Sequence, residues 1–192
     1  MDLAIDQRGA GALHVLATRF AGVGLRCVTD LSTGATTLAS RRCGMIVTEC
    51  GRFRAVHGRW WPHYGSLVEC LWEQKMRRMP GDRCELFYHQ SLTSPGFLTI
   101  DYVRTGRSTS LATCYAASLI LDEIARLRRT NAIVCNVIND RISDRLLERW
   151  GWQAHCPSWS GRHFIKRFYG EYPTTPTGWQ ARLASRSQPG DL

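Results

Sequence analysis

Two long segments of the chain carry apolar residues at helical spacing. Residues 63–79 follow Pro62, repeat Leu, Val, Trp and Met on one face and stop at Pro80-Gly81, which predicts an amphipathic helix. The segment 110–129, SLATCYAASLILDEIARLRR, is apolar on most faces and ends in cations that suit the helix dipole. We therefore expect this second helix to lie mostly buried against a sheet.

Shorter runs of β-favouring residues predict the strands. The runs 84–90 and 96–103 flank the turn-forming SLTSPG, so we expect them to pair as antiparallel neighbours. Residues 26–42 hold two further runs around Ser32-Thr33-Gly34, which predicts a hairpin because glycine adopts the positive φ of a tight turn. Another strand is expected at Met45–Thr48.

The segment 135–156, CNVINDRISDRLLERWGWQAHC, joins strands and a short helix with few residues between them. Gly151 can adopt the left-handed geometry that ends a helix, and the tryptophans on either side of it can bury large areas against the sheet. The expected elements are a strand at 132–138, a helix at 141–150 and strands at 152–157 and 163–168.

This alternation of strands and helices predicts an α/β fold with a mixed, mostly antiparallel central sheet flanked by helices. The 192 residues and 44% hydrophobic content fit one packed domain. We assign this domain to residues 25–172, after an N-terminal extension over 1–24. Residues 173–192 are dominated by Pro, Thr, Ser, Gly and Arg, and we expect a flexible, mostly disordered tail there.

Charge and cysteine usage narrow the possible partners. The formal net charge of +9 suggests an anionic partner, namely nucleic acid, a membrane surface or a phosphorylated cofactor. The N-terminus lacks the layout of a secretion signal and no apolar run approaches the ~20 residues of a membrane span, so we expect a cytoplasmic protein without a membrane partner. The eight cysteines form no CxxC pair, and we expect free thiols and no metal site.

A motif around the short helix resembles one from a known superfamily. In the GNAT superfamily of N-acetyltransferases a strand leads into a short helix of the form N-x-x-(A/S)-x-x-L-Y-E-x-x-G-F. The residues at matching positions here are Asp140, Ser143, Leu146, Glu148, Gly151 and Trp152, with Asn139 one residue earlier. The order of elements over roughly residues 84–168 also resembles this superfamily, which implies a GNAT-like fold.

The resemblance implies acetyl-CoA as the acyl donor and a phosphate-binding loop in VRTGRSTSL (103–111), where Gly106 is the only glycine. In such a loop, backbone N–H groups, a helix N-terminus and arginines bind the pyrophosphate. The residues that the resemblance places against the coenzyme are Tyr102, Val103, Arg104, Gly106, Arg107, Ser108, Thr109 and Asn139. A basic turn before a capped helix is equally compatible with a purely structural role.

Acyl transfer from a thioester to an amine needs a base for the amine proton and a donor for the oxyanion. Asp101 precedes the loop, and Glu85 and His89 lie on the preceding strand; we take Asp101 and His89 as the catalytic candidates. Leu147 stands where the family has a tyrosine acid, so another tyrosine must serve or the thiolate leaves unaided. The implied function is an acyl-CoA-dependent N-acyltransferase with an unidentified amine acceptor.

Two alternatives remain open at this point. The stretch 41–64, RRCGMIVTECGRFRAVHGRWWPHY, interleaves arginines with aromatic residues, a mixture typical of single-stranded nucleic acid binding. Such a non-catalytic module would use Arg52, Arg54, Arg59, Trp60 and Trp61. The other alternative is a GNAT-like domain that is retained for protein interaction.

Overall fold

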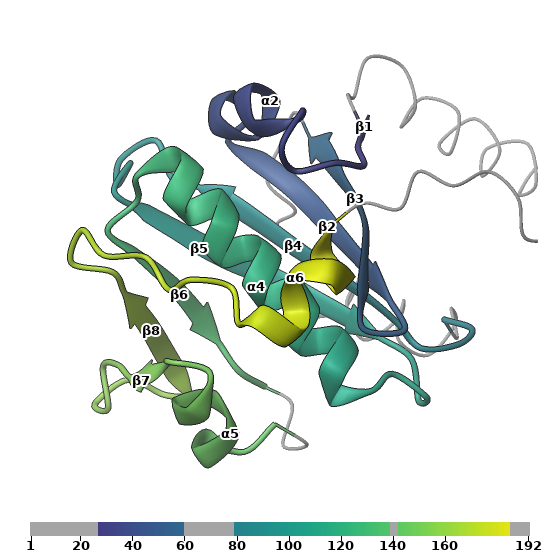
Figure 1. Ribbon diagram of the computed structural model, residues 1–192. Coiled ribbons are helices and arrows are strands. Elements are labelled where there is room, and N and C mark those ends of the chain that lie inside the picture. Colours follow the sequence, from purple (N-terminus) through teal and green to yellow (C-terminus); the bar gives the residue numbers. More distant parts are fainter. Residues whose placement is uncertain (1–26, 60–78, 139–141, 185–192) are drawn as a thin grey trace, which may run out of the picture.

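The structure is a computed structural model that describes residues 27–59, 79–138 and 142–184. An eight-stranded sheet with the order β1-β3-β2-β4-β5-β6-β8-β7 forms its centre (Figure 1). The strands are β1 (Cys27–Val28), β2 (Cys43–Glu49), β3 (Arg52–Arg59), β4 (Arg83–Gln90), β5 (Phe97–Thr105), β6 (Ala132–Asn136), β7 (Gln153–Ala154) and β8 (His163–Arg167). The helices are α2 (Ala35–Ser40), α4 (Leu111–Arg128), α5 (Asp144–Arg149) and α6 (Thr177–Leu183).

Helix α4 crosses one face of this sheet and forms the core with it (Figure 1). Its N-cap is Ser110, whose side chain accepts a hydrogen bond from the N–H of Thr113, and its last turn carries basic residues that favour the negative end of the helix dipole. Ile120 and Ile124 of α4 are fully buried, as are Ile46 of β2 and Leu98 of β5. The predicted buried helix is thus confirmed almost to the residue.

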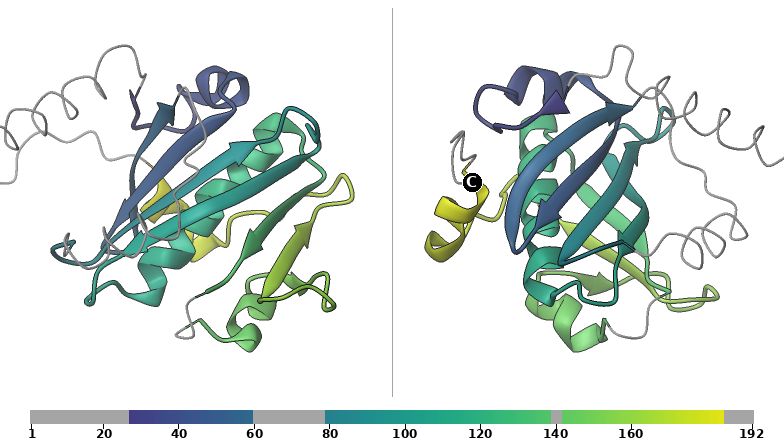
Figure 2. Two further views of the ribbon diagram at one scale, coloured as in Figure 1. Left: turned by 180° about the vertical axis from the view of Figure 1, so that it is seen from behind. Right: turned by 90° about the vertical axis from the view of Figure 1, so that its right-hand side faces the viewer.

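The centre of the sheet contains a bulge and a point of divergence. Tyr88 pairs with Ile100 and Phe87 with Tyr102, so Asp101 is an extra residue in β5. β5 and β6 run parallel but pair only over Phe97–Thr99, after which β5 continues without pairing to β6. The two halves of the sheet separate beyond this point (Figure 2).

Several predicted elements are confirmed. β4 and β5 are antiparallel neighbours, and β6, α5, β7 and β8 follow in the predicted order with shorter bounds. Gly151 has a φ of +85° directly after α5, which confirms the left-handed end of that helix. The mixed, mostly antiparallel α/β sheet is also confirmed. The helix predicted at 63–79 lies almost wholly outside the described residues.

Three predictions were wrong or incomplete. Residues 26–42 do not form a hairpin, because β1 pairs with β3 and the second run folds into α2. Residues 52–59 were not predicted as a strand, yet β3 pairs with β2 along its length. The segment beyond Tyr172 is not disordered over its described part, since α6 buries Leu183 and packs Trp179 against Tyr115 of α4.

No helix within the described ranges combines the length and the apolar character that a membrane crossing requires.

Candidate functional site

The face of the sheet opposite α4, here called the second face, carries both predicted catalytic residues. Along β4, Leu86 and Tyr88 pack into the core under α4. Because side chains alternate along a strand, Glu85, Phe87 and His89 point to the second face. The middle of this face is shielded from water, since Phe87 and Glu85 each keep only 5% of their surface exposed. Polar groups on it are therefore poorly hydrated and need partners within the protein.

His89 and Asp101, the two predicted catalytic residues, meet on this face. The Nδ1 atom of His89 hydrogen-bonds to Oδ1 of Asp101, and the two side chains are 13% and 6% exposed. Asp101 is the residue that the bulge inserts into β5, two residues beyond the last pair with β6. When Nδ1 donates its hydrogen to a carboxylate, the neutral ring has its basic lone pair on Nε2.

Two further side chains extend this pair into a row across four neighbouring strands. Cys43 of β2 lies opposite His89 on one side and opposite Arg59 of β3 on the other. Ile46 faces the core, so the alternation along β2 places Cys43 on the second face. The guanidinium carbon of Arg59 lies 5.2 Å from the ring centroid of Phe87. We call Arg59, Cys43, His89 and Asp101 the four-strand row.

The sequence analysis missed Cys43 because no motif marks it. The signal that could have found it is the alternation of Met45–Thr48, extended back by two residues, together with the pairing of this strand with 84–90. Burial raises the pKa of the Cys43 thiol, as does the charge of Asp101, while Arg128, Arg59 and Arg42 act in the opposite direction. The thiol is thus protonated at neutral pH, and its reactivity depends on a nearby base.

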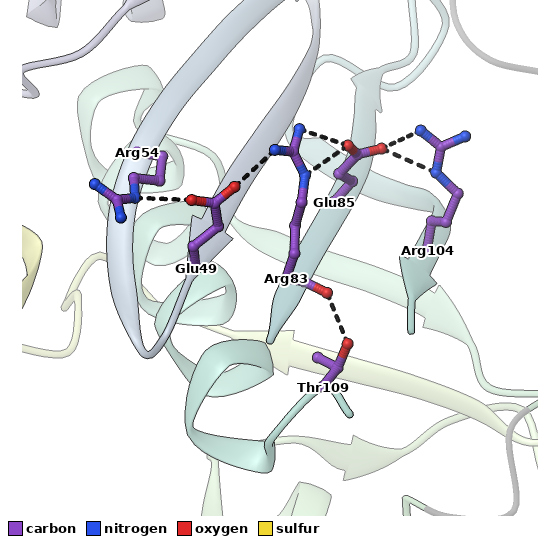
Figure 3. A network of polar contacts seen from close by, with 6 residues as sticks. All are labelled: Glu49, Arg54, Arg83, Glu85, Arg104 and Thr109. Carbon is purple, nitrogen blue, oxygen red and sulfur yellow. Dashed lines mark hydrogen bonds and ion pairs between the residues drawn. The ribbon is translucent and has the colours of Figure 1, made fainter. Parts of the chain in front are cut away.

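A chain of ion pairs occupies the other end of the second face (Figure 3). It runs across four strands through Arg54, Glu49, Arg83, Glu85 and Arg104. Oε1 of Glu85 accepts hydrogen bonds from Arg83 at 3.0 and 2.8 Å, and Oε2 accepts two from Arg104, one of them at 2.9 Å. Both oxygens of Glu85 are thus engaged by guanidinium groups. Glu85 therefore has a structural role here.

The predicted phosphate loop is tied to the protein through its own polar groups. The hydroxyl of Ser108 donates to the carbonyl of Gly81, and that of Thr109 donates to the carbonyl of Arg83. The N–H of Gly106 donates to Oγ1 of Thr109 at 2.8 Å. A Cβ at Gly106 would lie 2.6 Å from the carbonyl oxygen of Met79, so glycine is required there by close packing. Arg107 is exposed and has no ion pair within the described part of the chain.

An acidic side chain stands at the helix N-terminus that the loop leads into. Asp82 accepts hydrogen bonds from the N–H and the hydroxyl of Ser110, both at 2.8 Å. Burial acts to raise the pKa of Asp82, but the hydrogen bonds from the Ser110 N–H and from the hydroxyls of Thr113 and Ser110 outweigh it and lower the pKa. The ionised carboxylate thus occupies the anion position of α4. A pyrophosphate fits this position only if Asp82 leaves it.

The remaining coenzyme candidates are spread over different environments. Tyr102 lies on the second face, with its ring centroid 6.0 Å from that of Phe87. Val103 packs against the core on the other face, and Arg104 is bound to Glu85. Asn139 lies outside the described residues. Of the predicted coenzyme contacts, the structure therefore brings together only the loop residues 106–109.

The predicted nucleic-acid surface is only partly assembled. Arg52 and Arg54 are exposed on β3, and Arg54 pairs with Glu49 at 3.0 Å. Arg59 instead lies over Phe87, and Phe53 is buried in the core, where it is not available to stack on a base. Trp60 and Trp61 lie outside the described residues.

Within the described ranges, no group of three or more His, Cys, Asp or Glu side chains is placed to bind a metal ion. The seven cysteines described there form no disulfide bond with one another. Comparisons of the chain with protein-family models, with curated proteins and with solved structures find no match.

Proposed function

We propose that this protein is an N-acyltransferase, which moves an acyl group from a thioester to an amine. The observation that carries the proposal is the hydrogen bond between His89 and Asp101 at the bulge of β5. The pair lies beside the point at which β5 and β6 diverge, and backbone groups are least engaged in sheet pairing at such a point.

Each residue of the pair has a distinct role in this reaction. His89 accepts the proton of the attacking amine at Nε2, and Asp101 orients the ring and stabilises the imidazolium that forms. Their low exposure strengthens the interaction between the two charges, because little water screens it. The order of strand, loop, long helix, parallel strand and short helix supports the same proposal through its resemblance to the GNAT superfamily.

Acetyl-CoA remains the proposed donor, with Arg107 as the loop side chain that is exposed to meet a phosphate. Asp82 opposes this contact through charge repulsion at the start of α4. Asp82→Asn keeps an acceptor for the N–H of Ser110 and removes the charge. We expect it to tighten acetyl-CoA binding in calorimetric titration, while acetyl-pantetheine, which lacks the pyrophosphate, binds both proteins equally.

The test of the proposed function is thiol release from acetyl-CoA and from acetyl-pantetheine in the presence of a panel of primary amines. We expect His89→Gln to lower kcat by about 10²–10⁴-fold, the usual contribution of a general base. His57→Gln is the matched control, since His57 is a half-buried histidine on β3, two strands away from β4 in the sheet. Absence of thiol release from both donors, together with salt-dependent RNA binding, would instead establish the nucleic-acid module.

A further inference from the structure

Cys43 and His89 form the central pair of the four-strand row, and their side chains have the closest approach that an antiparallel ladder allows. The N–H of Gln90 donates to the carbonyl of Arg42 at 2.8 Å, which makes these residues a hydrogen-bonded pair. Pairs alternate along an antiparallel ladder, so the next one, Cys43 and His89, is non-hydrogen-bonded. In such a pair the Cα atoms lie about 4.5 Å apart and the side chains stand next to each other on one face.

Cys43 on β2, His89 on β4 and Asp101 on β5 therefore lie in the order of a nucleophile, a base and an orienting carboxylate. Asp101 hydrogen-bonds to Nδ1 of His89. The strand pairing places the same imidazole ring, with its Nε2, beside Cys43. Arg59 flanks Cys43 from the other side, and its positive charge acts against the larger effect of burial, which raises the pKa of the thiol. This order is the arrangement that activates a nucleophile through an oriented base.

We propose that Cys43 is a catalytic nucleophile that carries the acyl group as a thioester before the amine receives it. The inference rests on the proposed acyl transfer and adds a covalent intermediate to it. The donor is an acyl thioester, and no oxidant, reductant or metal takes part.

The reaction balances in two steps. In the first, Nε2 of His89 takes the proton of the Cys43 thiol, Sγ attacks the acyl carbonyl, and the donor thiolate leaves with the proton from His89. In the second, the amine attacks the Cys43 thioester, His89 accepts the amine proton, and Sγ leaves as a thiolate that His89 reprotonates. The bond formed in the first step is of the same kind as the bond broken, so that step has little net driving force in either direction.

The burial of the row suits this chemistry. Cys43 keeps 6% of its surface exposed, so water is largely kept from hydrolysing an acyl-cysteine. The same burial keeps the resting thiol protonated, which protects it from oxidation and leaves its activation to His89. The positive charge of Arg59 acts on Cys43 and would favour the thiolate as it forms.

The experiment is a single turnover without an amine acceptor. The full chain is incubated with acetyl-CoA, with acetyl-pantetheine or with S-phenyl thioacetate, an activated donor that needs no pyrophosphate contact. After an acid quench, intact-mass and peptide mass spectrometry locate the acetyl group. We expect one acetyl group on Cys43 that disappears when an amine is added. Cys43→Ala should abolish it, and His89→Gln should slow its formation by about 100-fold or more.

Cys27→Ala is the matched control, because Cys27 is exposed on β1 and lies outside the four-strand row. Cys43→Ser, which preserves the volume of the side chain, and a melting curve for each variant separate lost chemistry from lost folding. If amines are acylated while Cys43 stays unmodified with all three donors, the covalent step is overturned and the proposed function stands. If neither adduct nor acylated amine forms, both proposals are overturned.

Discussion

Two buried carboxylates on opposite faces of the sheet differ in how completely their negative charge is compensated by hydrogen-bond partners. Glu85, on the second face, is 5% exposed and receives hydrogen bonds from two arginines on both oxygens. Asp122, on the buried side of α4, is 4% exposed and accepts one bond at 2.6 Å from Lys166. Its Oδ1 has no hydrogen-bond partner within the described residues.

The difference appears in the proton affinity of Asp122. Burial raises the pKa of Asp122 to about 6 even though Lys166 acts to lower it. A planar guanidinium satisfies a carboxylate at two positions, whereas an ammonium group satisfies it at one. The chain of ion pairs through Glu85 thus links neighbouring strands, and Asp122 is the less compensated of the two carboxylates. Neither carboxylate is available as a base at the four-strand row, which leaves that role to His89 and Asp101.

Removing the single partner of Asp122 should have the largest effect on stability. In Lys166→Met a buried carboxylate is left uncompensated, and we expect a loss of about 3–5 kcal/mol in the free energy of unfolding at pH 7. Urea denaturation measures it. Adding Lys166→Met to an Asp122→Asn background should cost much less, because no charge remains there; an equal loss in both backgrounds would show that packing of the lysine stem dominates.

The pH dependence of this pair follows from the raised pKa of Asp122. An unfolded Asp titrates near 3.9, so between about pH 4 and pH 6 the folded state binds more protons than the unfolded state. The contribution of Asp122 to stability therefore falls as the pH rises through this window, by on the order of 2 kcal/mol. Asp122→Asn should remove that slope, and a wild-type slope in the variant would assign it to other groups.

An intermediate effect is expected on the second face. Glu85→Gln leaves Arg104, which is 17% exposed, and Arg83 without their shared carboxylate, although Arg83 keeps Glu49 at 2.7 Å. We expect a loss of about 1–3 kcal/mol, the scale of lost charge-assisted hydrogen bonds. Glu49→Gln is the control, since Glu49 is 30% exposed and its loss should cost less. The reverse ranking would place the centre of the network at Glu49.

The smallest effect belongs to the exposed end of the same chain of ion pairs. Arg54 is 57% exposed and pairs with Glu49 at 3.0 Å, so Arg54→Gln should change the free energy of unfolding by less than about 1 kcal/mol. Denaturation in low and high salt checks this, because the small difference should vanish when salt screens the charges. A loss comparable to that of Glu85→Gln would mean that the chain acts as one cooperative unit.

Local sequence signals were reliable where a segment decides its own conformation. The periodicity of 110–129 and the capping hydroxyl of Ser110 specify α4, and Gly151 specifies the end of α5. They failed at 26–42, where the threonines of α2 read as β-favouring residues although the segment packs as a helix against α4. They also failed at β3, which was not predicted as a strand.

The candidate site was partly accessible from the sequence. Asp101 and His89 were identified as separate candidates from their chemistry, but their contact depends on the bulge that inserts Asp101 into β5. The loop at Gly106 was expected from the resemblance to the GNAT superfamily, but its contacts include Asp82, which lies 28 residues before Ser110 in the chain. Such long-range partners leave no periodic signal.

The sequence by itself determined the main helix and most of the central and C-terminal strands, because each depends on the spacing of apolar residues within one segment. Only the tertiary structure decided what the polar residues do. The pairing of β2 with β4 places Cys43 opposite His89. The pairing of β4 with β5 brings Glu85 and Arg104 together as an ion pair. Strand register fixes these neighbours, and register is set by the packing of the whole sheet against α4.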